Sequence, residues 1–282
     1  ETPVENDINL VKLNKTVDKS VVRCLDKKAE KKMIAIIDQA KANGDSVGGS
    51  FEVIAKGLPY GLGTYVNADG KLQGRIAQAM MSVNAFKGVE IGAGFASGAV
   101  FGSELHDEIL YEDGQITRSS NNAGGIEGGM SNAQPIIINA TMKPLSTLSK
   151  PLRSVDISSH ENKKAHKERT DSCAVPSAAV IGESMACFII ADMLLDKFGG
   201  DSMKQLHALV FVTDALAHIL AQLAELRAED GAVGEFFAGD LRVGRSDGAQ
   251  SGTAEGVVAR EAPTAVRASS RAWSPAAPGA LW

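Results

Sequence analysis

The sequence predicts a mixed α/β fold. Apolar residues recur at steps of three and four over 22–40, which is typical of a helix, and alternate with polar or small residues over 48–56, which is typical of a strand. A second such pair follows, because an apolar strand at 135–142 precedes an apolar helix that begins at Pro176 and ends after Phe198. With 44% hydrophobic residues in a chain of 282, a sizeable core can form.

Turn and cap residues set the bounds of these elements. Asn43 and Gly44 end the first helix, since both residue types readily adopt left-handed backbone. The turn formers at 57–61 close the first strand. A second helix is predicted over 72–86 from apolar residues on one face, followed by a short strand near 88–91. Pro176 suits a helix start, where its missing amide hydrogen has no cost.

Composition excludes several classes of protein. The net charge of −5 and a pI near 5.6 argue against a nucleic-acid binder or a membrane-surface binder. Three widely spaced cysteines form no disulfide framework, which indicates a reducing compartment. The longest apolar runs, such as Ala186–Ala191, are far below the roughly 20 residues that span a bilayer, so we expect no transmembrane helix. Glu1 in place of methionine indicates that the chain is truncated at its front end.

The last eighty residues differ in composition from the rest. Residues 1–203 contain 17 Lys and 17 Ile, whereas residues 204–282 contain one of each. Leucines at helical spacing predict one helix over 203–228. From Gly244 onward Ala, Gly, Ser, Pro and Arg dominate without periodicity, which predicts disorder. We therefore separate a domain at 1–203 from an unassigned tail at 204–282.

A glycine-rich segment at 121–132 is the strongest local motif. Its paired glycines let backbone approach a ligand closely and point successive amides at one anion, such as a phosphate or a flavin edge. The alternative is a glycine-rich surface loop. A run of four glycines in six residues has a high entropic cost, and this favours the functional interpretation.

Other motifs are weaker. Ser131 within Gly-Met-Ser-Asn-Ala superficially resembles a hydrolase nucleophile, but a strand-like run follows it where a helix is needed. Glycines at 92, 94 and 98 hint at a dinucleotide site, with the third glycine displaced. His160, His166 and Cys173 could surround zinc, but the histidines lie in a polar, solvated run, so we predict no metal site.

Arg169 and Asp171 lie two residues apart immediately before the last helix. In an extended segment they project to the same side, so the guanidinium can hold an anionic group while the carboxylate accepts or relays a proton. From these residues alone, a structural salt bridge between them is an equally good interpretation.

With these motifs in view, residues from about 44 to 201 resemble the second half of chorismate synthase. The ordered matches are Gly44–Gly49, Gly61–Gly63, Met81–Phe95, Gly102–Glu104 with Asp107 and Glu108, Asn122–Gly129, Lys143 and Pro144 with Ser146 and Thr147, and Arg169–Glu183. Several motifs in the same order over roughly 160 residues leave little room for coincidence.

The resemblance implies an activity and a fold. Enzymes of this family belong to the shikimate pathway and convert 5-enolpyruvylshikimate 3-phosphate to chorismate by anti 1,4-elimination, with reduced flavin mononucleotide (FMN) as cofactor. The implied fold is a partial β-α-β sandwich, to which the tail from 204 onward does not belong. The implied assembly is a homotetramer, and the implied location is the cytoplasm, with a plastid as the alternative.

The resemblance also implies roles for individual residues. Asn84 and Ala85 correspond to a pair that touches the flavin, and Gly128 to a loop glycine whose small size lets the isoalloxazine approach. Lys143, Pro144, Leu145, Ser146 and Thr147 correspond to the segment that grips the flavin. Arg169 corresponds to a flavin-contacting arginine, and Asp171 to the catalytic acid that assists proton removal.

The chain departs from the family before Gly44. No Gly-Glu-Ser-His-Gly motif and no arginine-rich substrate segment occurs there, and Arg118-Ser119-Ser120 does not replace the family's Arg-Ser-Ser-x-Arg-Glu motif. We therefore expect a partial chorismate synthase that carries the flavin side of the site. The alternative is a non-catalytic flavin-binding or interaction fragment, because elimination without phosphate-binding arginines loses most of its transition-state stabilisation.

Overall fold

The computed structural model describes residues 10–112, 115–167, 171–212 and 267–272. The chain divides into two compact units, of which the first comprises Glu1–Gly199 and Ala265–Trp282 and the second Gly200–Thr264. In the second unit residues 203–212 are helical, which agrees with the start of the helix predicted at 203–228. The remainder of that predicted helix lies outside the described residues.

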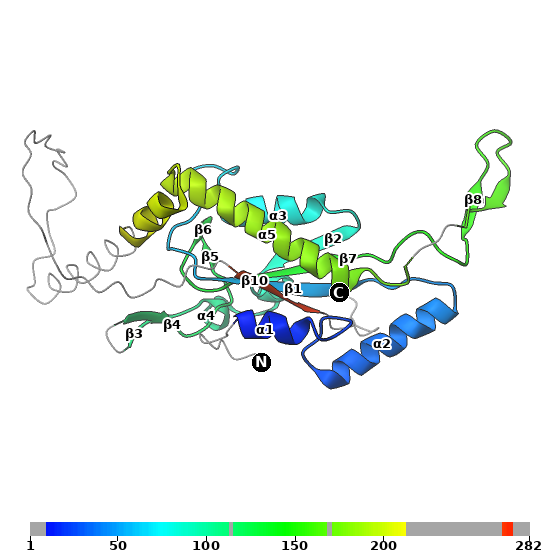
Figure 1. The fold of residues 1–282 in the computed structure, drawn as a ribbon, viewed down its shortest axis with the longest axis horizontal. Coiled ribbons are helices and arrows are strands. Elements are labelled where there is room, and N and C mark those ends of the chain that lie inside the picture. The colour runs from blue at the N-terminus through cyan, green and yellow to red at the C-terminus, as the bar shows by residue number, and fades with distance from the viewer. Residues whose placement is uncertain (1–9, 113–114, 168–170, 213–266, 273–282) are drawn as a thin grey trace, which may run out of the picture. The chain divides into compact units, whose positions relative to one another are not determined.

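A four-stranded antiparallel sheet forms the centre of the first unit, in the order β10-β1-β7-β2 (Figure 1). Its strands are β1 (Gly49–Lys56), β2 (Phe86–Ile91), β7 (Ile136–Met142) and β10 (Arg267–Ala272). The register places Ile138 between Val53 on one side and Ile91 on the other. The strands predicted at 48–56, 88–91 and 135–142 are thus confirmed, and with them the mixed α/β class.

Strand β10 lies in a stretch for which the sequence predicted disorder and no element. Its backbone pairs with β1 from Phe51 to Lys56. The segment reads Arg-Ala-Ser-Ser-Arg-Ala, without the apolar alternation that identifies a half-buried strand. Main-chain pairing at a sheet edge does not require that alternation, so the pattern could not reveal this strand. The rest of the predicted disordered tail lies outside the described residues.

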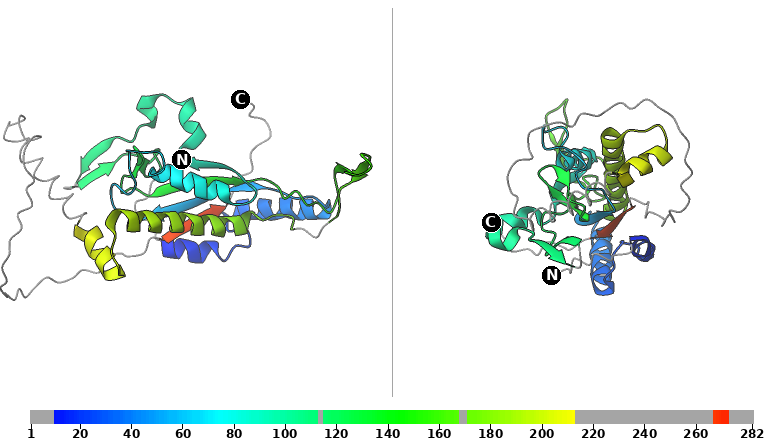
Figure 2. Two further views of the ribbon diagram at one scale, coloured as in Figure 1. Left: turned by 90° about the horizontal axis from the view of Figure 1, so that it is seen from above. Right: turned by 90° about the vertical axis from the view of Figure 1, so that its left-hand side faces the viewer.

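Two helices, α3 (Leu72–Ser82) and α5 (Val175–Phe198), pack on the sheet on the same side (Figures 1 and 2). Helix α3 buries Leu72, Ile76 and Met80, which recur every four residues and so share one face. Helix α5 turns a stripe of mostly small residues toward the core, and its buried residues are Val175, Ala178, Ala179, Gly182, Ala186, Ile190 and Met193. The helix predicted from Pro176 to 198 is confirmed, whereas the helix predicted at 72–86 ends at Ser82 and Phe86 already belongs to β2.

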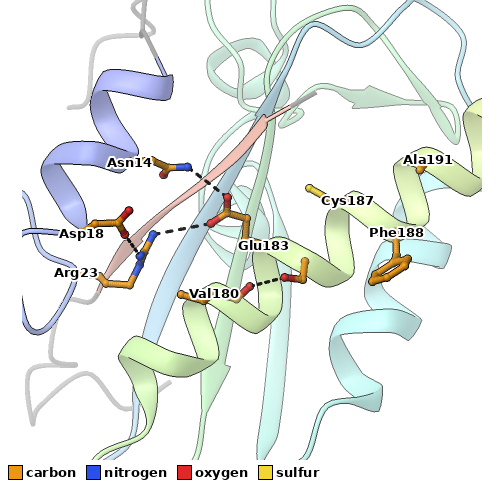
Figure 3. Close-up of a pocket in the computed structure, with 9 residues that line it drawn as sticks. Asn14, Asp18, Arg23, Val180, Glu183, Cys187, Phe188 and Ala191 are labelled. Atoms are coloured by element: carbon orange, nitrogen blue, oxygen red, sulfur yellow. Dashed lines mark hydrogen bonds and ion pairs between the residues drawn. The ribbon is translucent and has the colours of Figure 1, made fainter. Parts of the chain in front are cut away.

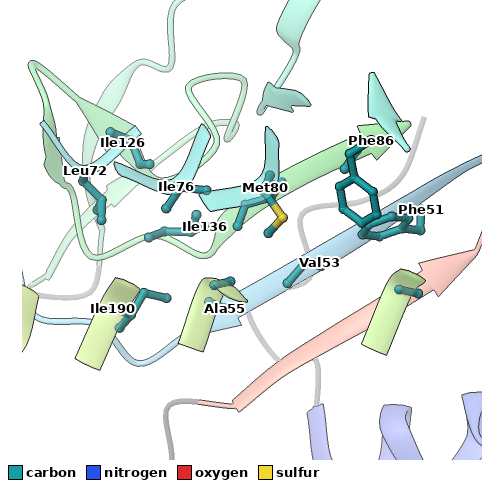
Figure 4. Close-up of a cluster of buried hydrophobic side chains, with 14 of the residues drawn as sticks. Phe51, Val53, Ala55, Leu72, Ile76, Met80, Phe86, Ile126, Ile136 and Ile190 are labelled. Carbon is teal, nitrogen blue, oxygen red and sulfur yellow. The ribbon is translucent and has the colours of Figure 1, made fainter. Parts of the chain in front are cut away.

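The core between these layers is built around two aromatic rings (Figure 4). Phe51 and Phe86 meet edge to face with centroids 5.3 Å apart. A Cβ atom added at Gly182 would lie 2.6 Å from Cε2 of Phe51, so only glycine lets α5 approach this ring without a shift. Tight packing of this kind fixes the position of α5 on the sheet.

Residues 10–44 form two further helices, α1 (Leu10–Val17) and α2 (Lys27–Ala42). Asp26 caps α2, since its carboxylate accepts hydrogen bonds from the amides of Lys28 and Ala29. Helix α2 ends at Ala42, with Asn43 as a right-handed C-cap and Gly44 next with φ of 67°, so only Gly44 has the predicted left-handed conformation. The helix begins at Lys27 and not at Val22, where the apolar spacing placed it. A small cluster of Val22, Cys24 and Met33 is buried beside α2.

The remaining elements are short and connect the sheet to the loops of the candidate site. They are the 3₁₀ helix η1 (Gly94–Ala99), helix α4 (Gly102–Leu105), and the hairpins β3 (Ile109–Glu112) with β4 (Gln115–Arg118), β5 (Ile126–Glu127) with β6 (Met130–Ser131), and β8 (Arg153–Val155) with β9 (Asn162–Lys164). The sequence predicted none of them, because pieces of two to six residues carry too little periodicity.

Candidate functional site

The turn after α3 brings two predicted residues, Asn84 and Ala85, against a third, Lys143. The amide of Lys143 donates a hydrogen bond of 2.9 Å to the carbonyl of Ala85. Phe86 then pairs with Met142 as β2 joins β7. Ala85 has φ of 69°, a left-handed conformation that costs an alanine roughly 1–2 kcal/mol. Backbone strain of this kind gathers at ligand sites, where the surrounding structure over-determines it.

The segment from Lys143 to Thr147 continues outward from β7 along a second segment, Ser46–Gly48. The buried hydroxyl of Ser46 donates to the carbonyl of Leu145 over 2.6 Å. A Cβ atom on Gly48 would lie 2.8 Å from the amide nitrogen of Pro144, so the two backbones touch. Lys143, Pro144 and Ser146 have exposed side chains, whereas Leu145 and Thr147 are half-buried.

The same segment, Ser46–Gly48, reaches the loop that carries Asp171. The amide of Val47 donates to the carbonyl of Ser172 over 2.8 Å, and Val47 forms a parallel bridge with Cys173. Three parts of the chain are therefore neighbours here, around residues 84–85, 143–147 and 171–173. In the sequence, Ser46–Gly48 was identified only as part of the family match Gly44–Gly49, and no role in the site was predicted for it.

Asp171 is exposed and lies immediately before α5. Its predicted partner Arg169 lies outside the described residues. Burial raises the pKa of the neighbouring Cys173 thiol, a change that a hydrogen bond with the backbone of Val175 only partly offsets. The thiol is therefore protonated at neutral pH.

Gly128 lies at the other end of the sheet. The glycine-rich loop joins the beginning of β7, where the Asn121 side-chain amide donates to the carbonyl of Pro135 over 2.8 Å. Lys143 follows the last residue of β7, so this strand of seven residues, about 20 Å long, lies between the loop's end at Pro135 and Lys143. Gly128, at the exposed tip of the hairpin of β5 and β6, has φ of 59° and open space where a Cβ would lie. The structure does not bring Gly128 next to Ala85 and Lys143.

The first amides of the glycine-rich loop already have an anionic partner within the protein. The carboxylate of Asp107 accepts from the amide of Asn122 over 2.7 Å and from that of Ala123 over 2.9 Å. The amides of Gly124 and Gly125 bond to Asn121. These four amides are thus not directed at a ligand phosphate, contrary to the expectation from the glycine pattern.

Two alternative motifs have structural explanations. Ser131 is 1% exposed, and its hydroxyl donates to the carbonyl of Pro59 over 2.5 Å while accepting from the amide of Leu62 over 2.8 Å. A serine held in this way is not an accessible nucleophile, so the hydrolase interpretation is wrong. Gly92 is needed because a Cβ there would lie 2.5 Å from the amide nitrogen of Gly124. Within the described ranges no group of three His, Cys, Asp or Glu side chains could hold a metal ion.

A cavity of about 640 Å³ lies elsewhere, between α1 and α5 (Figure 3). Arg23 pairs with Asp18 and lies 3.8 Å from a carboxylate oxygen of Glu183. Burial raises the pKa of Glu183, opposed by Arg23 and by a hydrogen bond from Asn14. None of the predicted site residues lines this cavity; its lining residues are Asn14, Asp18, Arg23, Val180, Glu183, Ser184, Cys187, Phe188 and Ala191.

Helix α5 is long and apolar enough to cross a membrane by length and composition alone, and a third of its most apolar window is buried. That finding differs from the expectation of no such helix, which rested on uninterrupted apolar runs. Small and polar residues interrupt the runs without lowering the mean hydropathy of 1.9. The buried stripe of α5 packs on the sheet, as in the core helix of a globular fold.

Known proteins are similar to this chain in sequence and in fold. Residues 4–195 match the family described as chorismate synthase. The match begins forty residues before Gly44, so the expectation that the chain departs from the family there is wrong. Chorismate synthase 2 of Bacillus cereus is 50% identical over 202 residues, and chorismate synthase of Shouchella clausii is 50% identical over 206 residues. These alignments cover 71% and 73% of this chain, and 52% and 53% of the relatives. The chain therefore spans about half the length of the relatives it matches.

A solved structure gives the same result for the fold. A crystal structure of chorismate synthase superposes with a TM-score of 0.64 at 36% sequence identity. The match covers 76% of this chain and 57% of the other.

Proposed function

The chain belongs to the chorismate synthase family, and from that premise we propose that it carries the flavin side of a site that converts 5-enolpyruvylshikimate 3-phosphate to chorismate. In this reaction the bond from ring carbon to phosphate oxygen breaks, a ring proton leaves from the opposite face, and a new double bond forms. Inorganic phosphate is released, and there is no net oxidation or reduction.

One observation carries the proposal most directly. Residues far apart in the sequence, Ala85, Lys143 and Asp171, lie on segments that hydrogen bonds link at the end of strand β7. Short side chains on a strained backbone and one exposed cation suit an anionic, planar ligand. These residues therefore fit reduced FMN as the cofactor.

Individual roles follow from the chemistry of each residue. Lys143 supplies positive charge to the phosphate of FMN, and the hydroxyls of Ser146 and Thr147 donate hydrogen bonds to it. Asn84 and Ala85 have short side chains that let the flavin ring system approach the backbone. Pro144 and Leu145 provide apolar contacts beside the ring. Bound reduced FMN supplies transient electron density that helps the carbon–oxygen bond to break.

Proton transfer is the role we propose for Asp171. Its carboxylate is exposed at the end of the segment next to Val47, where it can accept a proton and pass it on. We propose that Arg169 contacts the flavin beside it, as the family motif implies. A flavin contact of Gly128 is proposed on the family motif alone, because Gly128 lies at the opposite end of β7 from Ala85 and Lys143.

The assembly and location belong to the same proposal. Exposed apolar residues on α5, with Phe188 73% and Leu195 51% exposed, support a central place for this helix in a complete β-α-β sandwich. We propose a homotetramer on family grounds, which light scattering can test. The relatives are from Bacillus and Shouchella, genera without plastids, and this favours the cytoplasm.

A non-catalytic flavin-binding fragment is the second candidate, and the observation that favours it is the coverage of about half of each relative. The test is anaerobic turnover of 5-enolpyruvylshikimate 3-phosphate with reduced FMN, followed as phosphate release. The chain is assayed alone and after coexpression with the part of the Bacillus cereus relative outside the alignment. Turnover in either sample supports the enzyme, whereas flavin binding without turnover in both favours the fragment.

A further inference from the structure

The antiparallel pairing of β1 and β7 ends just before the candidate site. Its last pair is Gly49 with Met142, and two residues further along the chain Pro144 has no amide hydrogen to extend the ladder. Continuation of the same register by three residues would place Ser46 opposite Leu145. The chain beyond the sheet therefore needs a contact of another kind at this position.

The side chain of Ser46 supplies that contact. Its hydroxyl donates to the carbonyl of Leu145 over 2.6 Å, and the residue is 8% exposed. A buried carbonyl that loses its donor is left desolvated without a partner, so this bond restrains the backbone around Leu145. Backbone hydrogen bonds of 2.9 Å, donated by the amides of Lys143 and Lys150, hold the two ends of the same segment. Ser46 thus holds the middle of the segment.

The residue after Ser46 contacts a different part of the candidate site. The amide of Val47 donates to the carbonyl of Ser172 over 2.8 Å, directly after Asp171 in the chain. Two consecutive residues therefore join the segment that carries Lys143 to the segment that carries Asp171. The first makes the link through its side chain and the second through its backbone, so only the first link can be removed by substitution.

We propose that Ser46 is a positioning residue for flavin binding. Its hydroxyl fixes the backbone between Lys143 and Thr147 in advance, so that the lysine charge and the hydroxyls of this segment meet the phosphate of FMN together. Ser46 acts through Leu145 and is assigned no contact with the cofactor. The inference rests on the proposed function, since this segment must bind the phosphate. Preorganisation of this kind improves affinity by removing the entropic cost of ordering the segment on binding.

Two variants and a matched control test the inference in the full chain. Ser46→Ala removes the hydroxyl, whereas Ser46→Thr keeps it. Ser50→Ala is the control, because the Ser50 hydroxyl also bonds across the same pair of strands, to the hydroxyl of Thr141 over 2.7 Å, but within the sheet. Hydrogen exchange over residues 143–150 reports the anchor itself, circular dichroism reports folding, and anaerobic titration with reduced FMN reports the affinity.

Ser46→Ala is expected to exchange faster over residues 143–150 and to bind reduced FMN about fivefold more weakly, the effect of one lost hydrogen bond. Ser46→Thr and Ser50→Ala should stay within about twofold of the unaltered chain, because both keep the hydroxyl that Leu145 accepts. Circular dichroism should show the same secondary structure in all four proteins.

A double-mutant cycle with Lys143→Ala separates positioning from general damage. Without the lysine charge the Ser46 hydroxyl has less to position, so Ser46→Ala should weaken binding by about twofold or less in the Lys143→Ala background. General damage to the fold is independent of the lysine, so it would weaken binding by about fivefold in both backgrounds.

Four results for the variants would overturn the inference. Unchanged exchange in Ser46→Ala would contradict the anchor, and faster exchange with unchanged affinity would contradict its role in binding. Equal losses of affinity in Ser46→Ala and Ser46→Thr would show that the hydroxyl is not the cause. Equal losses with and without the lysine would indicate general damage. If the unaltered chain binds no reduced FMN, the proposed function fails and the inference with it, and this is visible before any variant is compared.

Discussion

The backbone amide of Lys143 and the carbonyl of Ala85 are joined by a hydrogen bond of 2.9 Å, although 58 residues separate them in the sequence. The bond holds the turn after α3 against the end of β7. It also fixes Ala85 in a left-handed conformation, with φ of 69°. The candidate site thus includes a strained alanine whose carbonyl accepts a hydrogen bond from the neighbouring segment.

Substitutions at Ala85 should show whether its backbone conformation is strained. Ala85→Gly is expected to change the free energy of unfolding by less than about 1 kcal/mol, because glycine adopts positive φ without steric cost. Ala85→Val should lower the melting temperature clearly, since a β-branched residue is a true outlier at this φ. Thermal unfolding followed by circular dichroism measures both. Equal stability of the valine and glycine variants would contradict the backbone conformation described here.

The contact between α5 and the sheet should tolerate no added methyl group. Gly182→Ala places Cβ 2.6 Å from the Phe51 ring, and overpacking of this kind costs about 1–3 kcal/mol. Gly74→Ala in α3 is the matched control, because its Cβ would meet nothing closer than 3.5 Å and alanine favours helix by up to about 1 kcal/mol. Urea unfolding should therefore show loss of stability for one variant and none for the other. Stabilisation by both changes would rule out the packing between Gly182 and Phe51.

Glu183 should make stability depend on pH in a predictable direction. Burial raises its pKa in the folded state above that in the unfolded chain, so the folded state binds the proton more tightly. Stability from this group is present below the unfolded pKa of about 4.3 and is lost as pH rises through the folded pKa. Glu183→Gln should therefore gain stability relative to the unaltered chain between pH 4 and pH 7.5.

The neighbouring Ser184 provides the comparison for this experiment, because its hydroxyl, which donates to the carbonyl of Val180, does not titrate in this range. Ser184→Ala should show the same stability relative to the unaltered chain at both pH values. A gain for Glu183→Gln that is the same at pH 4 and pH 7.5 would contradict the effect of burial.

Asp171 should affect the chemical step more than cofactor binding. Asp171→Ala is expected to leave the affinity for reduced FMN nearly unchanged while slowing elimination by about a hundredfold or more, the usual effect of removing a proton-transfer group. Asp171→Asn keeps the shape and should be equally slow. Single-turnover phosphate release, with flavin affinity measured in parallel, distinguishes the two effects. Unchanged turnover in both variants would contradict the assignment of Asp171 as the proton-transfer group.

The sequence predicted the long elements well because each carries enough residues to display its period. Strand β1, helix α3 and helix α5 were all predicted within a few residues of their observed bounds. The hairpins β5–β6 and β8–β9 were missed, since two or three residues per strand show no periodicity. Strand β10 was missed because its pairing with β1 is a property of the backbone.

The spatial arrangement of the candidate site residues could not be predicted from the sequence. Lys143 and Ala85 are neighbours through a backbone hydrogen bond, which no side-chain pattern announces. The glycine-rich loop was predicted to direct its amides at a ligand, yet the first of them bond to Asp107. Asp107 lies more than ten residues earlier, and a contact of that separation depends on the tertiary fold.

The central claim is that the segments around Ala85, Lys143 and Asp171 bind reduced FMN. Anaerobic titration of the full chain with reduced FMN, followed by the flavin absorbance spectrum, tests it most directly, with Lys143→Ala and the exposed Lys87→Ala compared in parallel. We expect saturable binding to the unaltered chain and to Lys87→Ala, and about tenfold weaker binding to Lys143→Ala, since a charged hydrogen bond to phosphate is lost. Equal affinity in all three, or no binding by any, would contradict the account.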